Sequence, residues 1–186
     1  TTLIEKEGAD SIYAFIFETV SGSSTGAWAP PKGYYDRIQE ICRKNNILMI
    51  ADEVMCGAGR TDQFFACEHY GLKPDVVVMG KGINAGLVPV SAVIVKEADV
   101  DTMKKGSGGF MHAQTYMQAP SLAATTLSVL TYFEKHDVLA QAKSVGEYFQ
   151  KKLIDQILPL PNVGCVTGIG HMAGIEFVAN KATREP

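Results

Sequence analysis

The run ILMIADE at residues 47–53 indicates the class of fold more clearly than any other part of this sequence. Its leading apolar residues do not alternate with polar ones, which is typical of a strand buried on both faces in a parallel sheet. Similar short apolar runs occur at residues 12–17, 75–79 and 91–95, and apolar residues at helical spacing occupy residues 34–44. Strands that alternate with helices predict an α/β protein with a mostly parallel sheet.

The second half of the chain is predicted to be mainly helical. We expect a short helix at residues 64–70, long helices at 115–134 and 137–157, and a closing pair of strands at 163–167 and 172–178. The sequence therefore ends in a helix followed by a hairpin, separate from the run of buried strands.

The composition excludes several classes of protein. The chain has 186 residues, of which 46% are hydrophobic and 20% charged, with a net charge of −3. No cluster of Lys and Arg suggests a nucleic-acid or membrane-surface partner, and no apolar run is long enough to span a bilayer. The 4 cysteines lack CxxC spacing and the 4 histidines share no metal-ligand spacing, so we expect no metal site. Reduced thiols without a signal peptide predict a cytoplasmic protein.

Three polar residues, Glu18, Asp52 and Lys81, each follow a predicted strand. Ligands of parallel sheets gather at the carboxyl ends of strands, so these residues are candidates for a site. Gly80 and Gly82 flank the lysine and would permit close approach of the backbone to a ligand. Alternatives stay open at this point, because Asp52 could cap a helix and a lysine is more often a solvated surface group.

An acid and an amine on neighbouring strand ends suit pyridoxal 5'-phosphate as a cofactor. Desolvation favours a neutral amine, which can form a Schiff base with an aldehyde. A carboxylate paired with the pyridine nitrogen keeps that nitrogen protonated, so that the ring can accept electrons. Asp52 and Lys81 are the residues that this chemistry requires.

Five segments in order resemble class III (subgroup II, omega-type) aminotransferases, which have pyridoxal-phosphate fold type I. The match is more specific than a single motif because it extends over nearly the whole chain. The segments are residues 31–35, 48–61, 74–83, 112–116 and 173–177.

The resemblance implies a fold and a division into domains. Residues 1–134 would form part of the large cofactor-binding domain, a three-layer α/β sandwich with a mostly parallel sheet. Residues 135–186 would form a linking helix and the beginning of a small C-terminal α+β domain. The chain begins with Thr1 rather than Met. We therefore expect a fragment from the middle of a longer protein.

Roles for individual residues also follow from the resemblance. It implies that Lys81 forms the Schiff base with the cofactor and moves the substrate proton. Asp52 would contact the pyridine nitrogen, Val54 would pack on one face of the ring, and Glu18 would lie beside the substrate pocket. Thr115 would bond the cofactor phosphate of a partner subunit, which implies a homodimer with a shared site.

The implied reaction moves an amino group from an amine or amino acid donor to a keto acid. Many family members have Gln where this chain has Met55, and Met cannot donate the same hydrogen bond. Met55 keeps a second hypothesis open, an aminomutase or racemase of the same fold, similar to glutamate-1-semialdehyde aminomutase. A third hypothesis is a non-catalytic relative that binds partners, although such a protein would need neither Asp52 nor Lys81.

Parts of the family's site would lie outside this chain. By the resemblance, the phosphate-binding turn and the aromatic residue that stacks on the ring precede residue 1, and a substrate-binding arginine follows residue 186. We therefore expect residues 1–186 alone to be inactive.

Overall fold

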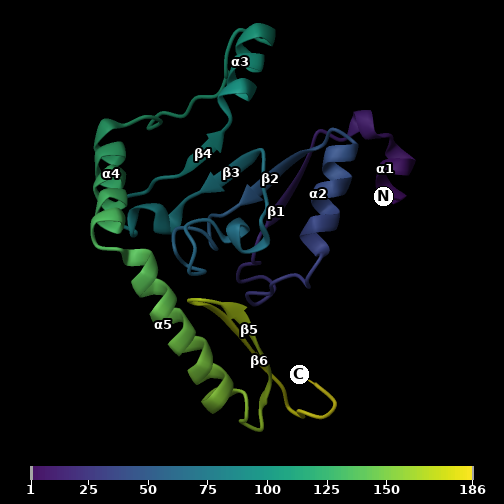
Figure 1. Ribbon diagram of the computed structural model, residues 1–186, viewed down its shortest axis with the longest axis vertical. Coiled ribbons are helices and arrows are strands. Elements are labelled where there is room, and N and C mark those ends of the chain that lie inside the picture. The colour runs from purple at the N-terminus through teal and green to yellow at the C-terminus, as the bar shows by residue number, and fades with distance from the viewer. Residues whose placement is uncertain (1, 186) are drawn as a thin grey trace.

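The computed structural model describes residues 2–185 and contains two separate sheets (Figure 1). The first has the order β1-β2-β3-β4, made of β1 (Ala14–Glu18), β2 (Leu48–Asp52), β3 (Val76–Met79) and β4 (Ala92–Val95). β1, β2 and β3 are parallel, and β4 pairs antiparallel with β3. The prediction of an α/β protein with a mostly parallel sheet is confirmed.

The helices follow the strands in the alternating order that the sequence predicts. Helix α2 has the predicted bounds, and the helix predicted at 137–157 is present as α5 with a π-helical continuation, η4. The helices are α1 (Thr2–Glu7), α2 (Tyr34–Lys44), α3 (Glu97–Gly106), α4 (Pro120–Lys135), α5 (Val138–Lys152) and η4 (Leu153–Ile157), together with short 3-10 helices η1 (Ala9–Ser11), η2 (Ala66–Tyr70) and η3 (Lys81–Asn84).

One helix prediction needs correction, and one helix has no counterpart among the predictions. The helix expected from residue 115 begins at Pro120, because proline fits the first helical position and forces Ala119 into an extended conformation. Thr115 therefore lies in a turn before the helix. Helix α3 was not predicted, because it has no buried residue and so lacks an apolar periodicity. Its acidic first turn and basic last turn match the helix dipole, and this charge pattern is the feature of the sequence that could have indicated the helix.

The main core lies between α2, β2 and η2. Met49 and Ala51 of β2 are 2% and 0% exposed, and side chains from α2 and from the segment around η2 pack against Met49. Alternation along β2 therefore directs one set of side chains into this core and the other set, which ends at Asp52, to the opposite face. The core residues are Tyr35, Cys42, Ile47, Met49, Cys67 and Leu72.

The second sheet is an antiparallel hairpin of β5 (Val163–Ile169) and β6 (Met172–Phe177). Helices α4 and α5 run along one side of the molecule and lead from the first sheet to this hairpin (Figure 1). The Thr167 hydroxyl donates a hydrogen bond to the Gly26 carbonyl oxygen, so the hairpin is tied to the loop that follows β1. The domain boundary between residues 134 and 135 stays a prediction. Within residues 2–185, no helix is long and apolar enough to cross a membrane.

Gly174→Ala tests the contact between the hairpin and the first sheet. A methyl group at residue 174 would overlap the Gly26 carbonyl oxygen, and backbone cannot move aside as a side-chain end can. We expect a loss of about 1–3 kcal/mol in the free energy of unfolding, measured by denaturant titration. Gly109→Ala is the control, because a methyl group at residue 109 meets nothing within 4 Å. Equal stability of the two variants would contradict this account of the contact.

Candidate active site

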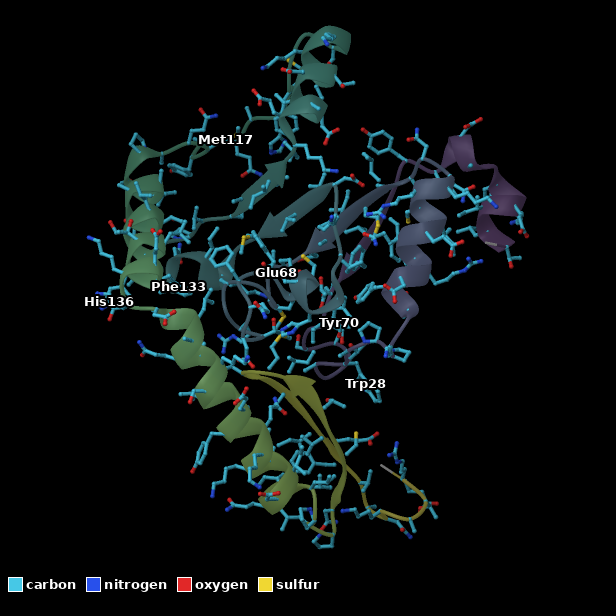
Figure 2. All side chains as sticks on the ribbon, in the orientation of Figure 1. Trp28, Glu68, Tyr70, Met117, Phe133 and His136 are labelled. Atoms are coloured by element: carbon cyan, nitrogen blue, oxygen red, sulfur yellow. The ribbon has the colours of Figure 1, made fainter. Side chains whose placement is uncertain are left out.

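A cavity of about 1030 Å³ lies where the loops after β1, β2 and β3 meet the hairpin. Its size is at the upper end of small-molecule sites, which span about 300–1000 Å³. Phe133 of α4, on the side of that helix toward the sheet (Figure 2), completes the lining. The other lining residues come from segments 22–27, 54–60, 81–86 and 171–175.

Lys81 is exposed and lines this cavity as the first residue of η3, separated from the end of β3 by Gly80. Its backbone φ is 43°, in the left-handed region that residues with a side chain rarely adopt. Within residues 2–185 its ammonium group has no hydrogen-bond or ion-pair partner. A strained backbone and an unpaired amine in a cavity are features typical of a functional residue.

Asp52 ends β2, beside Glu18 of β1 and Val78 of β3 in the register of the sheet. Its side chain is half-buried, and its Oδ1 accepts a hydrogen bond of 3.1 Å from the Val54 backbone N–H. This bond fixes the turn by which the chain leaves the strand. The carboxylate is therefore held at the carboxyl edge of the sheet.

Val54 connects Asp52 to the segment that carries the lysine. Its side chain lines the cavity and reaches within 3.5 Å of the place that a Cβ atom on Gly80 would occupy. Asp52 is bonded to the backbone of residue 54, and Gly80 directly precedes Lys81. The structure thus brings Asp52, Val54 and Lys81 into one neighbourhood.

Glu18 and Thr115 are not among the residues that line the cavity. The Glu18 carboxylate accepts a hydrogen bond from the Gly22 backbone N–H and is otherwise exposed. Thr115 is exposed in the connection between α3 and α4. The substrate-pocket role of Glu18 and the phosphate role of Thr115 stay predictions.

The ionisable side chains that line the cavity are all basic: Arg60, Lys81 and His171. No carboxylate from residues 2–185 lines it. The Arg60 carbonyl oxygen accepts a 2.9 Å hydrogen bond from the His171 backbone N–H, which joins the loop after β2 to the hairpin. A cavity of this charge attracts phosphate and carboxylate groups.

Glu53 is a residue that the sequence analysis did not single out. It is 1% exposed, and its carboxylate accepts hydrogen bonds from the Thr19 hydroxyl at 2.7 Å and from the backbone N–H groups of Ala66 and Cys67 at 2.6 and 2.9 Å. Strand alternation was the available signal, because residue 53 continues the buried row of Met49 and Ala51.

The buried cysteines near Glu53 are not nucleophiles. Burial, reinforced by the negative charge of Glu53, raises the pKa of both Cys56 and Cys67 to about 12. Their thiols therefore stay protonated at neutral pH, and the thiolate is the reactive form. Among residues 2–185 no group of three or more His, Cys, Asp or Glu side chains could hold a metal ion.

The fold and the site define an α/β protein with a cavity at the ends of parallel strands that Lys81 lines. Asp52 does not itself line the cavity, but it accepts a hydrogen bond from the backbone of the lining residue Val54. Residues 1–185 match the sequence model of the family Aminotransferase class-III. The chain therefore belongs to the class III aminotransferase family.

Individual relatives agree with this assignment. The chain is 40% identical over 184 residues to an uncharacterized aminotransferase of Bacillus subtilis (strain 168), covering 99% of this chain and 41% of that protein. A thermostable (S)-enantioselective omega-transaminase from Thermomicrobium roseum superimposes with a TM-score of 0.93 at 38% identity, over 99% of this chain and 41% of that one. Taurine:2-oxoglutarate aminotransferase from Bifidobacterium kashiwanohense, in complex with PLP and glutamate, superimposes with a TM-score of 0.92 at 32% sequence identity. That alignment covers 99% of this chain and 41% of the other.

These proportions show that the chain spans about 41% of the length of the curated relative and of both solved structures. The similarity extends over both sheets and the helices between them. Fold type I, with its mostly parallel sheet, is therefore present in part.

Substitution of Asp62, in the loop after β2, tests the packing of this loop against α5 and the hairpin. Its Oδ1 is buried without a hydrogen-bond partner, and burial, opposed by the nearby His171 and His69, raises its pKa above the ordinary 3.8. Folding thus favours the protonated acid, and stability is lost as the pH rises from 3.8 through the folded-state pKa. Asn is neutral and tolerates the φ of 70° found there.

We expect Asp62→Asn to increase the free energy of unfolding at pH 7 by about 1 kcal/mol and to change it little below pH 4. Thermal unfolding at both pH values measures the difference. Asp10→Asn, at an exposed aspartate without a side-chain hydrogen bond among the described residues, is the control and should be neutral at both. An equal effect of Asp62→Asn at pH 7 and below pH 4 would exclude ionisation of Asp62 as the cause.

Proposed function

We propose that this protein is a pyridoxal-phosphate-dependent aminotransferase that moves an amino group from an amine or amino acid to a keto acid. The observation that carries the proposal is the placement of Asp52 and Lys81 on the ends of neighbouring parallel strands, with Val54 between them. Membership of the class III family supports it.

The residues present fit this cofactor. Lys81 lines the cavity, and its amine has no competing partner among residues 2–185. Val54 lines the cavity and offers an apolar surface for one face of a flat ring. Asp52 does not line the cavity, but its carboxylate accepts a hydrogen bond from the Val54 backbone N–H. The cationic lining suits a phosphate group.

When bound, the cofactor supplies an electron-withdrawing ring and an aldehyde carbon. Asp52 would accept the hydrogen bond of the ring N–H and keep that nitrogen protonated. Lys81 would hold the cofactor covalently at rest. During the reaction its amine would take the proton from the substrate Cα atom as a general base and return it as an acid. Val54 would orient the ring and exclude water from that face.

The substrates we propose are amine or amino acid donors and keto acid acceptors. Acceptors carry carboxylates, which the cationic cavity favours. The relative from Bifidobacterium kashiwanohense is named for 2-oxoglutarate and was solved with glutamate. The named relatives are transaminases, which favours net transfer over the aminomutase or racemase alternative that Met55 had kept open.

We further propose a cytoplasmic homodimer whose site is shared between subunits. The connection between α3 and α4 exposes Phe110, Met111 and Tyr116 by 64%, 90% and 82%, and apolar groups exposed so fully suit burial at an interface. Thr115 lies in the same connection, so an interface there would bring its hydroxyl to the partner. All 4 cysteines are free, as in a reducing compartment.

Lys81→Ala tests the proposed cofactor attachment. We expect the visible absorbance of bound pyridoxal phosphate to be lost, together with the mass increment found after borohydride reduction. Transaminase activity should fall at least about a hundredfold, because the residue also moves the proton. The measurement uses the protein expressed from its complete reading frame.

Lys73→Ala is the matched control, since Lys73 is also an exposed lysine but lies outside the cavity. It should keep the absorbance, the mass increment and the activity. A Lys81→Ala protein that retained the reducible cofactor would show that another residue is the attachment site.

A further inference from the structure

Glu53 lies one residue beyond Asp52, and the mechanism above does not use it. Its buried carboxylate accepts hydrogen bonds from one hydroxyl and two backbone N–H groups, with the Cys56 thiol also 3.5 Å away. All of these groups donate, and an ionised carboxylate is a pure acceptor. The environment of Glu53 is thus built for a carboxylate.

The hydrogen bonds of Glu53 close a loop. Residues 54–65 leave β2 and return to η2, and the Glu53 carboxylate joins the beginning of this loop to its end at Ala66 and Cys67. Inside the loop the backbone pairs with itself, as in the 2.8 Å bond from the Ala58 N–H to the Phe64 carbonyl oxygen. Val54, Met55 and Arg60 of the same loop line the cavity.

The hydrogen bond from the Thr19 hydroxyl connects Glu53 to a second wall of the cavity. Thr19 follows β1 directly, is fully buried, and begins the segment that reaches the cavity at Gly22. Its carbonyl oxygen also accepts a 2.8 Å hydrogen bond from the Tyr35 hydroxyl of α2. Glu53 therefore links the segment after β1, the end of β2 and η2 through a single side chain.

We propose that Glu53 is a positioning residue: its carboxylate fixes the two loops that form the cavity walls and so sets where Val54 and Asp52 meet the cofactor. This inference rests on the proposed function. Glu53 does not touch the cofactor in this account, and its effect reaches the site through the backbone of residue 54.

Glu53→Gln is the principal test. The amide keeps the size of the side chain but places an NH₂ group against donors, so that a buried N–H or O–H loses its acceptor. In the complete protein we expect the dissociation constant for pyridoxal phosphate to rise about tenfold or more. The pH midpoint of the bound cofactor's visible absorbance should also shift, because Asp52 would no longer hold its place beside the ring.

Two further variants make the test specific. Thr19→Val removes one donor while leaving the carboxylate, and we expect a shift in the same direction but smaller, about threefold in the dissociation constant. Glu68→Gln is the matched control (Figure 2). Glu68 also accepts a backbone N–H bond, from Phe65 at 3.0 Å, but it is exposed and lies outside the cavity lining. It should bind cofactor as the unmodified protein does.

A Glu53→Gln protein with lower thermal stability but an unchanged dissociation constant and pH midpoint would overturn the inference, because Glu53 would then be structural only. If Glu53→Gln does not fold, Thr19→Val decides: a raised dissociation constant supports the inference, and an unchanged one overturns it. Whatever the result for these variants, the proposed function stands if the unmodified protein binds the cofactor through Lys81. Absence of any Lys81-dependent absorbance in unmodified protein would overturn both.

Discussion

The parallel pairing of β1, β2 and β3 brings three distant chain segments to one edge of a sheet, and the cavity depends on it. Glu18, Asp52 and Val78 are partners in register, so the chain leaves the strands at nearly the same level. The loops that follow must then share one space. If β2 and β3 were antiparallel, their carboxyl ends would lie at opposite edges, and Asp52 could not reach the neighbourhood of Lys81.

Strand alternation gives the two adjacent carboxylates different environments. Asp52 follows the half-buried row of β2 and stays near the cavity, where only one of its oxygens is engaged by a backbone N–H. Glu53 follows the buried row and is surrounded by donors. Burying a carboxylate is costly unless hydrogen bonds replace its water. Glu53 has those hydrogen bonds and can stabilise the loops from a buried position. Asp52 could not do the same without losing its access to a ligand.

Much of the fold could be predicted because its strands are continuous apolar runs and α2 has one apolar side, which leaves a pattern in the sequence. The strands are not all buried on both faces as that pattern predicts, since Ile16 of β1 and Val93 of β4 are 62% and 63% exposed. The candidates at strand ends followed from the same pattern. Helix α3 has no buried side, so periodicity could not reveal it. The contacts of Glu53 with Thr19 and Ala66, and the burial of the Asp62 oxygen, depend on how loops fold back, which local sequence does not determine.

Near the cavity the acidic side chains have hydrogen-bond partners and two basic side chains do not, and this difference indicates the kind of ligand. The carboxylates of Glu18, Asp52 and Glu53 each accept a backbone N–H. Within residues 2–185 the side chains of Arg60 and Lys81 line the cavity with no hydrogen-bond or ion-pair partner. Both residues are exposed, and their positive charge attracts anions. A cofactor phosphate and a substrate carboxylate would supply them, while the Lys81 amine is left free to bond with carbon.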